Sequence, residues 1–208
     1  MICLFGGTFD PVHNGHLHAA RTAASYLACR TRLVLSARPP HRRLPAASLQ
    51  DRWAMLKSAC ADVPELIPDD SEIKSPNDSY TVETLGRVRR RNPDRQVFWV
   101  LGMDAFGDLP TWHRWREVFD LAHLLLLSRP GSKLDPPARA VYERYRLDGK
   151  PSSAAGGILK VDAPMLDVSA SGIRADLAEE RPVSHLLPNG VQAYIRQHGL
   201  YAGDRATA

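Results

Sequence analysis

Two short motifs at opposite ends of the sequence contain the residue types best suited to binding an anion. The first runs from Gly6-Gly7-Thr8-Phe9 to His13-Asn14-Gly15-His16, where a strand-like run ends and a helix is expected to begin. Two glycines let the backbone approach a ligand closely, and histidines three positions apart share one face of a helix. Helix N-termini favour anions, so both histidines would face an anion site. By itself this loop fits phosphate binding and ordinary turn structure about equally well.

The second motif begins at Ser169 and lies at another expected helix start. Ser169 and Ser171 supply hydroxyls, and Arg174 follows one helical turn later. Neither motif matches GxxxxGK[ST] or GxGxxG, the two commonest phosphate loops. The histidines of the first motif could instead bind a metal, but zinc needs a third protein ligand and Asp10 is the only local candidate. Two anion sites in one chain favour a ligand with several phosphates.

Alternating strand and helix patterns predict the framework that positions these motifs. Strands are expected at residues 2–5, 32–36, 97–101, 123–128 and 158–161, with short ones near Leu66 and Ile73. Helices are expected at residues 15–29, 48–61, 81–91, 171–180 and 188–198, the second with Ser48 as its N-cap. We therefore expect an α/β fold with a doubly wound, mostly parallel, Rossmann-like sheet. Ligands of such folds bind beyond the carboxyl ends of the strands, where the first motif lies.

Composition restricts the class of protein. The chain has 208 residues, of which 44% are hydrophobic and 24% charged, and this fits one packed globular domain. Its apolar runs are too short for a membrane helix, and its three cysteines fit reduced thiols in the cytoplasm better than a disulfide framework. The net charge of +4 suits an anionic ligand but is too small to select nucleic acid. The basic stretch at residues 87–95 is interpreted as a solvated helix end.

The two motifs together resemble the signature pair of the nucleotidyltransferase superfamily whose active sites carry the sequence His-x-Gly-His. They correspond here to residues 6–17 and 169–174. The remaining chain is similar to bacterial nicotinate-nucleotide adenylyltransferases, notably in Ser79-Tyr80-Thr81 and in residues 101–112. The resemblance covers nearly the whole chain. It implies one nucleotidyltransferase domain over residues 1–201. Residues 202–208 are expected to form a disordered tail, because chain ends fray.

The family resemblance implies a reaction and a set of roles. The reaction would transfer AMP from ATP to nicotinate mononucleotide by direct in-line displacement, giving nicotinate adenine dinucleotide and pyrophosphate in NAD biosynthesis. Catalytic roles would fall to His13, His16 and Arg174. ATP-binding roles would fall to Gly6, Gly7, Thr8, Phe9, Gly102, Asp104 (at the adenosine ribose), Ser169 and Ser171. Acceptor-binding roles would fall to Arg42, with Arg43 as a second candidate beside it, to Tyr80 and Thr81 at the pyridine carboxylate, and to Trp112 stacked on the pyridine ring.

The chain departs from the family pattern at three positions. Ser171 replaces the usual Thr and keeps the hydroxyl, and Val168 replaces Ile. Ser75, beside Lys74, stands where the family often has Arg, so one expected phosphate contact has no counterpart.

Simpler structural roles stay open for four of the residues. Trp112 could be a core residue, with Trp115 as the stacking side chain. Thr81 and Asp104 could each be a helix cap, and Asp10, which precedes Pro11, fits a turn-former better than a catalytic group.

The implied chemistry needs no general base. A phosphate monoester has its second pKa near 6, so the attacking phosphate is mostly a dianion at neutral pH. The difficulty is the repulsion between two anions, which positioned hydrogen-bond donors and cations overcome. Mg²⁺ would be carried mainly by the ATP phosphates, because the sequence has no acidic cluster built to hold it.

Three rival functions remain at this stage. Another enzyme of the superfamily, such as one acting on pantetheine phosphate, shares both motifs. A nucleotide-sensing module would bind ATP without turnover, although His13, His16 and Arg174 are all present. A nucleic-acid-binding role rests only on Arg89-Arg90-Arg91, so we expect no nucleic acid and no membrane as partners, and the sequence carries no signal of an oligomeric state.

Overall fold

The computed structural model describes residues 1–39, 44–131 and 133–202. Its centre is a six-stranded, fully parallel sheet with the strand order β3-β2-β1-β4-β5-β6. The strands are β1 (Ile2–Gly7), β2 (Thr31–Leu35), β3 (Leu66–Asp69), β4 (Val97–Gly102), β5 (His123–Ser128) and β6 (Ile158–Asp162). The strand order reverses between β1 and β4, as in a doubly wound sheet. The predicted α/β, Rossmann-like fold class is therefore confirmed.

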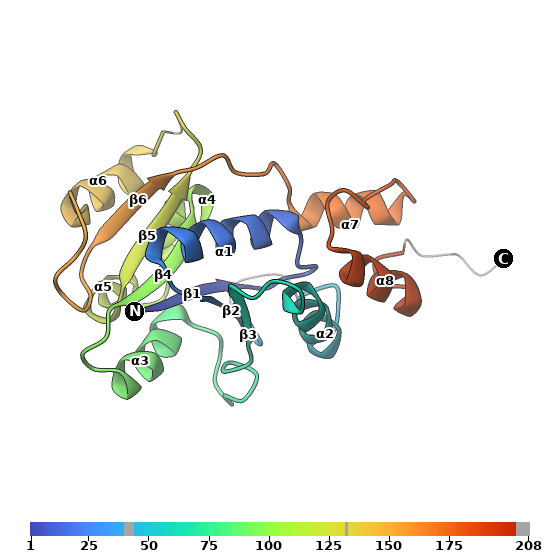
Figure 1. Cartoon of the computed structure of the whole chain (residues 1–208), viewed down its shortest axis with the longest axis horizontal. Helices are drawn as coiled ribbons and strands as arrows, with labels where there is room; N and C mark the ends of the chain where they lie inside the picture. Colours follow the sequence, from blue (N-terminus) through green and yellow to red (C-terminus); the bar gives the residue numbers. More distant parts are fainter. Residues whose placement is uncertain (40–43, 132, 203–208) are drawn as a thin grey trace.

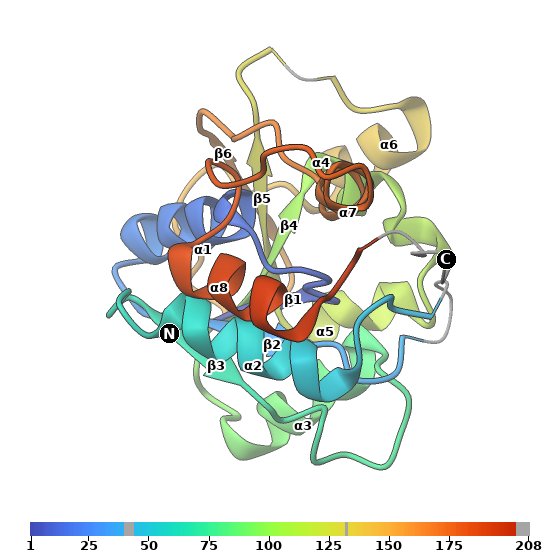
Figure 2. The same cartoon turned by 90° about the vertical axis from the view of Figure 1, so that its right-hand side faces the viewer.

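Helices cover both faces of the sheet and close its carboxyl end. They are α1 (Asn14–Leu27), α2 (Leu49–Cys60), α3 (Thr81–Arg91), α4 (Met103–Gly107), α5 (Val118–Leu121), α6 (Pro136–Tyr145), α7 (Ala170–Ala178) and α8 (Asn189–His198). Figure 1 shows α1 and α3 on opposite sides of the sheet, and α7 and α8 beyond the end at which β1 stops. Helix α8 packs against α2 (Figure 2). Within the described residues, no helix is both long and apolar enough to cross a membrane.

The central strands are buried on both faces, which explains their uninterrupted apolar sequences. Along β4, Val97, Trp99 and Leu101 belong to one core cluster, while Phe98 and Val100 belong to another on the opposite face. The first cluster lies under α3 to α6, and the opposite one lies under α1. A further cluster joins β2 to α1, α2, α7 and α8. The sheet is thus held rigidly, and the carboxyl ends of β1 and β4 are fixed side by side.

Some sequence-based expectations were wrong or incomplete. Ile73 is not in a strand, because the chain turns after β3, with Lys74 N–H donating to the Asp70 carbonyl at 3.1 Å. Helices α4 and α5 were not predicted, since they have only 5 and 4 residues and cannot show a helical period. Helix α6 was also missed, although Asp135 as N-cap followed by proline is a helix-start signal. Of the predicted tail, residues 203–208 lie outside the described residues.

The basic stretch at the end of α3 is only partly a solvated helix end. Arg90 and Arg91 are exposed, but Arg89 is half-buried and packs across the chain. Its guanidinium donates to the carbonyl oxygens of Leu121, Asn92, Pro93, Arg95 and Ala154. Arg89 therefore ties α3 to α5 and to the loop before β6, and it is not available to bind a nucleic acid.

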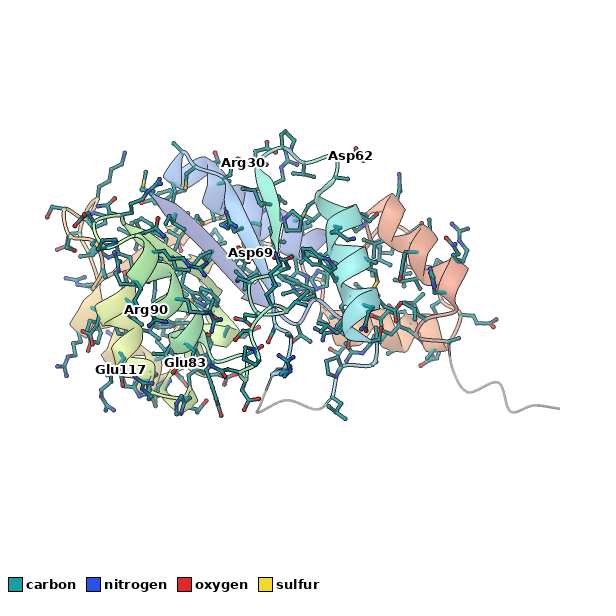
Figure 3. All side chains as sticks on the ribbon, turned by 90° about the horizontal axis from the view of Figure 1, so that it is seen from below. Arg30, Asp62, Asp69, Glu83, Arg90 and Glu117 are labelled. Carbon is teal, nitrogen blue, oxygen red and sulfur yellow. The ribbon has the colours of Figure 1, made fainter. Side chains whose placement is uncertain are left out.

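We predict that Arg89→Met lowers the free energy of unfolding by about 2–3 kcal/mol, because it leaves several half-buried carbonyl oxygens without a donor. Chemical denaturation with matched m-values measures this change. Arg90→Met is the control. Arg90 lies one position along the same helix and is exposed (Figure 3), so its loss should change stability by less than about 0.5 kcal/mol. Equal losses in the two variants would contradict the structural role of Arg89.

Candidate active site

The sequence-predicted site residues meet in one cleft beyond the carboxyl ends of β1 and β4. The cleft has a volume of about 1280 Å³. Its lining includes Gly6, Gly7, Thr8, Phe9, His13, His16, Tyr80, Thr81, Gly102, Asp104, Trp112, Ser169, Ser171 and Arg174. Arg42 and Arg43 lie outside the described residues. The two anion motifs, which are far apart in the sequence, therefore line the same cavity.

The loop after β1 is shaped by close packing. A Cβ atom on Gly6 would lie 2.3 Å from the indole ring of Trp99, so this end of β1 requires glycine. Phe9 is buried with φ of 48°, which reverses the chain, and the Asp10–Pro11 peptide bond is cis. A Cβ atom on Gly15 would lie 3.0 Å from Nδ1 of His13. Glycine between the two histidines thus leaves room for the imidazole of His13.

The two histidines form a capping box at the start of α1. His13 is the N-cap, one residue before the helix, and its Nδ1 accepts from the N–H of His16 at 3.3 Å. Nδ1 of His16 accepts in turn from the N–H of His13 at 3.3 Å. The rings stack with 3.6 Å between their centroids. Because each Nδ1 is an acceptor, we assign each proton to Nε2, which leaves an Nε2–H donor on both rings for a ligand in the cleft.

Both histidines are neutral at physiological pH in this structure. Burial lowers the pKa of His13 from 6.5 to about 4. Burial also lowers the pKa of His16 well below its ordinary value, and the neighbouring His13 adds to the effect. Neutral imidazoles remain hydrogen-bond donors, so the pair can donate to a phosphate without placing two positive charges side by side. Within the described ranges, no group of three or more His, Cys, Asp or Glu side chains is arranged to hold a metal ion.

The second anion motif is joined directly to the first. Ser169 is the N-cap of α7 and accepts from the N–H of Gly172 at 3.1 Å, with its hydroxyl 3.3 Å from that of Ser171. Nη1 of Arg174 donates to the main-chain carbonyl of Asp10 at 2.6 Å. The Arg174 side chain is 34% exposed, so part of its guanidinium still faces the cleft. Helix α7 therefore presents its hydroxyls and a cation to the same space as the histidine pair.

The start of α3 forms another side of the cleft. Tyr80 is the N-cap residue and Thr81 the first residue of the helix, so the alternative role of Thr81 as N-cap is wrong. The hydroxyl of Ser79 accepts from the N–H groups of Ala37 and Arg38, both at 2.9 Å, which ties this turn to the end of β2. The first N–H groups of a helix have no acceptor within the helix. Those of α3 therefore provide a further place for an anionic group.

A bridging arginine holds the tryptophan segment against α3. Arg114, which has φ of 51°, donates to Glu83 on α3 at 3.0 Å and also to Glu117. Both glutamates are labelled in Figure 3, on neighbouring parts of the molecule. Trp112 lines the cleft as a consequence, whereas Trp115 packs edge-on against Phe119 with 6.4 Å between ring centroids. The geometry favours Trp112 over Trp115 as the residue that can stack on a ligand.

Asp104 lies in the first turn of α4, directly after β4. The N-cap of α4 is Gly102, so the alternative role of Asp104 as a cap is wrong. Its carboxylate is exposed and lines the cleft. The Asp104 carboxylate therefore does not cap α4, and it can accept hydrogen bonds from hydroxyl groups of a ligand.

Sequence reasoning missed several residues that contribute to the cleft. His113 lines it and lies against Tyr80, with 4.4 Å between ring centroids. Arg129 also lines it and pairs with Asp167 at 2.9 Å. Glu72 is a buried lining residue, hydrogen-bonded to Thr84, and burial raises the pKa of its carboxyl group. None of the three lies in either anion motif, so residue type and spacing did not point to them.

This fold, with a histidine pair and a serine–arginine motif across one cleft, defines a class of phosphate-transferring proteins. Residues 4–176 match the cytidylyltransferase-like family. The chain is thus a nucleotidyltransferase. Two solved structures share its fold at 17% identity, each covering 96% of both chains. They are the Plasmodium falciparum nicotinic acid mononucleotide adenylyltransferase complexed with NaAD, with a TM-score of 0.76, and the same protein complexed with APC, with a TM-score of 0.73.

Sequence relatives narrow the class to one family. A Pseudomonas fluorescens protein named "Probable nicotinate-nucleotide adenylyltransferase" is 46% identical over 210 residues, with 96% of both chains covered. A Pseudomonas aeruginosa protein of the same name is 42% identical, again with 96% of both chains covered. The chain belongs to the nicotinate-nucleotide adenylyltransferase family.

The depressed pKa of His13 predicts how stability depends on pH. Below pH 6.5 the unfolded chain binds a proton at this residue that the folded protein does not bind until about pH 4. The free energy of unfolding should therefore fall as the pH drops through this window, by on the order of 3 kcal/mol from His13 alone. Denaturant titrations without nucleotide at half-unit steps of pH measure this slope.

His13→Asn isolates that contribution. Asparagine can still accept the hydrogen bond that caps α1, but it does not titrate. The variant should lose less stability than the wild type between pH 6.5 and 4. Identical slopes would show that His13 is not held neutral by the fold.

Proposed function

We propose that this protein transfers AMP from ATP to nicotinate mononucleotide, giving nicotinate adenine dinucleotide and pyrophosphate. The observation that carries the proposal is the meeting of two anion motifs and the α3 start in one cleft of about 1280 Å³. A nucleoside triphosphate and a second phosphate ester, bound together, need hydrogen-bond donors along the whole length of such a cleft. The name of the Pseudomonas relatives and the ligands in the Plasmodium structures support the same pair of substrates.

The triphosphate would lie between the start of α1 and the start of α7. Nε2–H of His13 and of His16 would donate to phosphate oxygens, and Arg174 would supply the positive charge. The hydroxyls of Ser169 and Ser171 and the backbone of Gly6, Gly7, Thr8 and Phe9 would complete this part of the site. Gly102 and Asp104, at the end of β4, would hold the adenosine, with the Asp104 carboxylate accepting from ribose hydroxyls.

The acceptor would lie on the other side of β1, toward α3. The start of α3, at Tyr80 and Thr81, would bind the pyridine carboxylate, because a helix N-terminus favours a negative group. The N–H of Tyr80 donates to the Asp78 carbonyl at 3.0 Å, so the donor to the carboxylate would be the N–H of Thr81. Trp112 would stack on the pyridine ring. Arg42 remains a predicted ligand of the acceptor.

The proposed reaction is one direct displacement at the α-phosphorus. An oxygen of the acceptor phosphate forms the new P–O bond as the bond to the β-phosphate oxygen breaks, and pyrophosphate leaves with that electron pair. The nucleophile needs no base, since it is already a dianion. The protein positions the two reactants and stabilises charge that builds on the α-phosphate and the leaving group. Mg²⁺ would enter with ATP as part of the substrate.

The free cysteines Cys3, Cys29 and Cys60 suit the reducing cytoplasm, which we propose as the location.

We predict that pyrophosphate release from Mg²⁺-ATP is fastest with nicotinate mononucleotide as acceptor. A neutral carboxamide at the α3 start loses charge-assisted hydrogen bonds, so nicotinamide mononucleotide should have a kcat/KM at least about tenfold lower. Pantetheine phosphate and flavin mononucleotide serve as further acceptors in the same assay. A preference for pantetheine phosphate would reassign the substrate, and no turnover with any acceptor would favour a nucleotide-sensing role.

The same assay separates the two tryptophans. Trp112→Ala should raise the KM of both pyridine mononucleotides while leaving their ratio largely unchanged, because stacking depends on the ring more than on its substituent. Trp115→Ala is the matched control and should leave both KM values near those of the wild type. The reverse result would move the stacking role to Trp115.

We also predict that His16→Ala lowers kcat by about 100-fold or more and changes ATP binding much less. This follows if its Nε2–H mainly stabilises charge that develops at the α-phosphate in the transition state. His18→Ala is the control, since His18 lies on the same helix but outside the cleft lining, with its ring 2.6 Å from the Pro164 carbonyl. Near-normal kcat in folded His16→Ala protein would remove His16 from the catalytic machinery.

A further inference from the structure

The end of the described chain returns to the loop after β1. Helix α8 stops at Gly199, which has φ of 60°, and Tyr201 follows with φ of 62°. Leu200 and Tyr201 pack against the core cluster that joins β2 to α1, α2, α7 and α8. The Tyr201 hydroxyl donates to Oδ1 of Asp10 at 2.7 Å, across 191 positions of sequence. A tyrosine outside both anion motifs is thus hydrogen-bonded to the loop of the first motif.

The carboxylate of Asp10 is satisfied by neutral donors. It is 6% exposed, and besides Tyr201 it accepts from the N–H of Ala46 at 2.8 Å and from the N–H of Ala47 at 3.1 Å. These bonds occupy both oxygens and aim the carboxylate at the segment before α2. Asp10 therefore has a definite structural role, larger than that of the turn-former expected from its place before proline.

Two guanidinium groups lie close to this carboxylate without a hydrogen bond to it. Nη1 of Arg174 lies 3.8 Å from Oδ2 of Asp10, too far for a hydrogen bond, and donates instead to the main-chain carbonyl of Asp10. Arg52 is only 2% exposed, and its Nη1 donates to the carbonyl oxygens of Thr8 at 2.9 Å and Ser36 at 2.8 Å. Arg174 therefore lies beside the Asp10 carboxylate but is hydrogen-bonded to the main chain of that residue.

The Tyr201 hydroxyl remains a donor across the physiological pH range. Burial, together with the hydrogen bond to Asp10, raises the pKa of Tyr201 well above its ordinary value. The phenol therefore keeps its proton. The direction of the hydrogen bond, from Tyr201 to Asp10, is fixed.

We propose that Tyr201 is a positioning residue for the triphosphate of ATP, acting through Asp10 on Arg174. Its hydroxyl keeps the Asp10 carboxylate hydrogen-bonded to the N–H groups of Ala46 and Ala47. The carboxylate therefore does not pair more closely with Arg174, and the guanidinium of Arg174 remains available to the nucleotide. Without this donor, Oδ1 loses one of its bonds, and the carboxylate can turn to close the 3.8 Å gap. A guanidinium paired with a carboxylate offers less charge and fewer donors to phosphate. The inference rests on the proposed role of Arg174 in binding ATP.

The test compares Tyr201→Phe with Tyr194→Phe by calorimetric titration of Mg²⁺-ATP without acceptor. Both changes remove one tyrosine O–H to aspartate bond, since the Tyr194 hydroxyl donates to Oδ1 of Asp51 at 2.9 Å. Tyr194 lies on α8 but does not line the cleft. We expect Tyr201→Phe to raise the Kd for ATP about three- to tenfold, the range for one hydrogen bond, and Tyr194→Phe to change it less than about twofold.

A double-mutant cycle with Arg174→Ala excludes a merely structural effect. If Tyr201 acts through Arg174, then adding Tyr201→Phe to Arg174→Ala should leave the Kd for ATP unchanged. An equal further loss in that background, or equal losses in Tyr201→Phe and Tyr194→Phe, would overturn the proposal. So would a Kd for ATP in Tyr201→Phe within twofold of the wild type. Wild-type turnover with nicotinate mononucleotide is measured separately, so its absence would refute the proposed function and not this one.

Discussion

The hydrogen bonds around Asp10 are the interactions on which the site most depends. The main-chain carbonyl of this residue accepts from Arg174, and its carboxylate accepts from Ala46, Ala47 and Tyr201. These contacts join the loop after β1 to the segment before α2, to α7 and to the end of the described chain. The sheet fixes where β1 and β4 end. The relative placement of the two anion motifs depends also on these few hydrogen bonds, which are buried or partly buried and 2.6–3.1 Å long.

The cleft provides many hydrogen-bond donors while carrying few fixed positive charges. A site for several phosphates needs many donors, yet a cluster of fixed cations would repel itself before the ligand arrives. Here burial keeps His13 and His16 neutral, as the lowered pKa of each shows. Helix starts at α1, α3 and α7 add N–H groups with no net charge. Arg174 supplies formal charge, and part of it is offset by the nearby Asp10 carboxylate.

Much of the fold followed from the sequence because the informative patterns are local. The buried strands β4 and β5 read as continuous apolar runs, and α1, α2 and α3 show long helical patterns. The failures also have local causes. Helices α4 and α5 are shorter than two helical turns, and the apolar Ile73 lies in the turn after β3, where it packs against the core instead of extending a strand.

The site was predictable to the same extent and for the same reason. His13, His16, Ser169 and Arg174 stand in compact motifs, and their types and spacing indicate an anion. His113, Glu72, Arg52 and Tyr201 each become relevant only through a contact that crosses many residues of sequence. No period or motif within one segment encodes such contacts. The capping box was also hidden, since spacing placed both histidines on one helical face, whereas His13 precedes the helix.

The position of α7 and α8 explains why the chain continues past the last strand. The sheet is complete at β6, and neither helix is needed to cover its central strands. Instead, α7 and α8 pack with α2 around β2 and the start of α1, beyond the carboxyl end of the sheet (Figure 2). This placement lets α7 and its N-cap bring Ser169, Ser171 and Arg174 to the cleft, while the segment after α8 returns Tyr201 to Asp10. A binding site at the open end of a parallel sheet has no strand to close it, and here α7 lines that end together with the starts of α1 and α3.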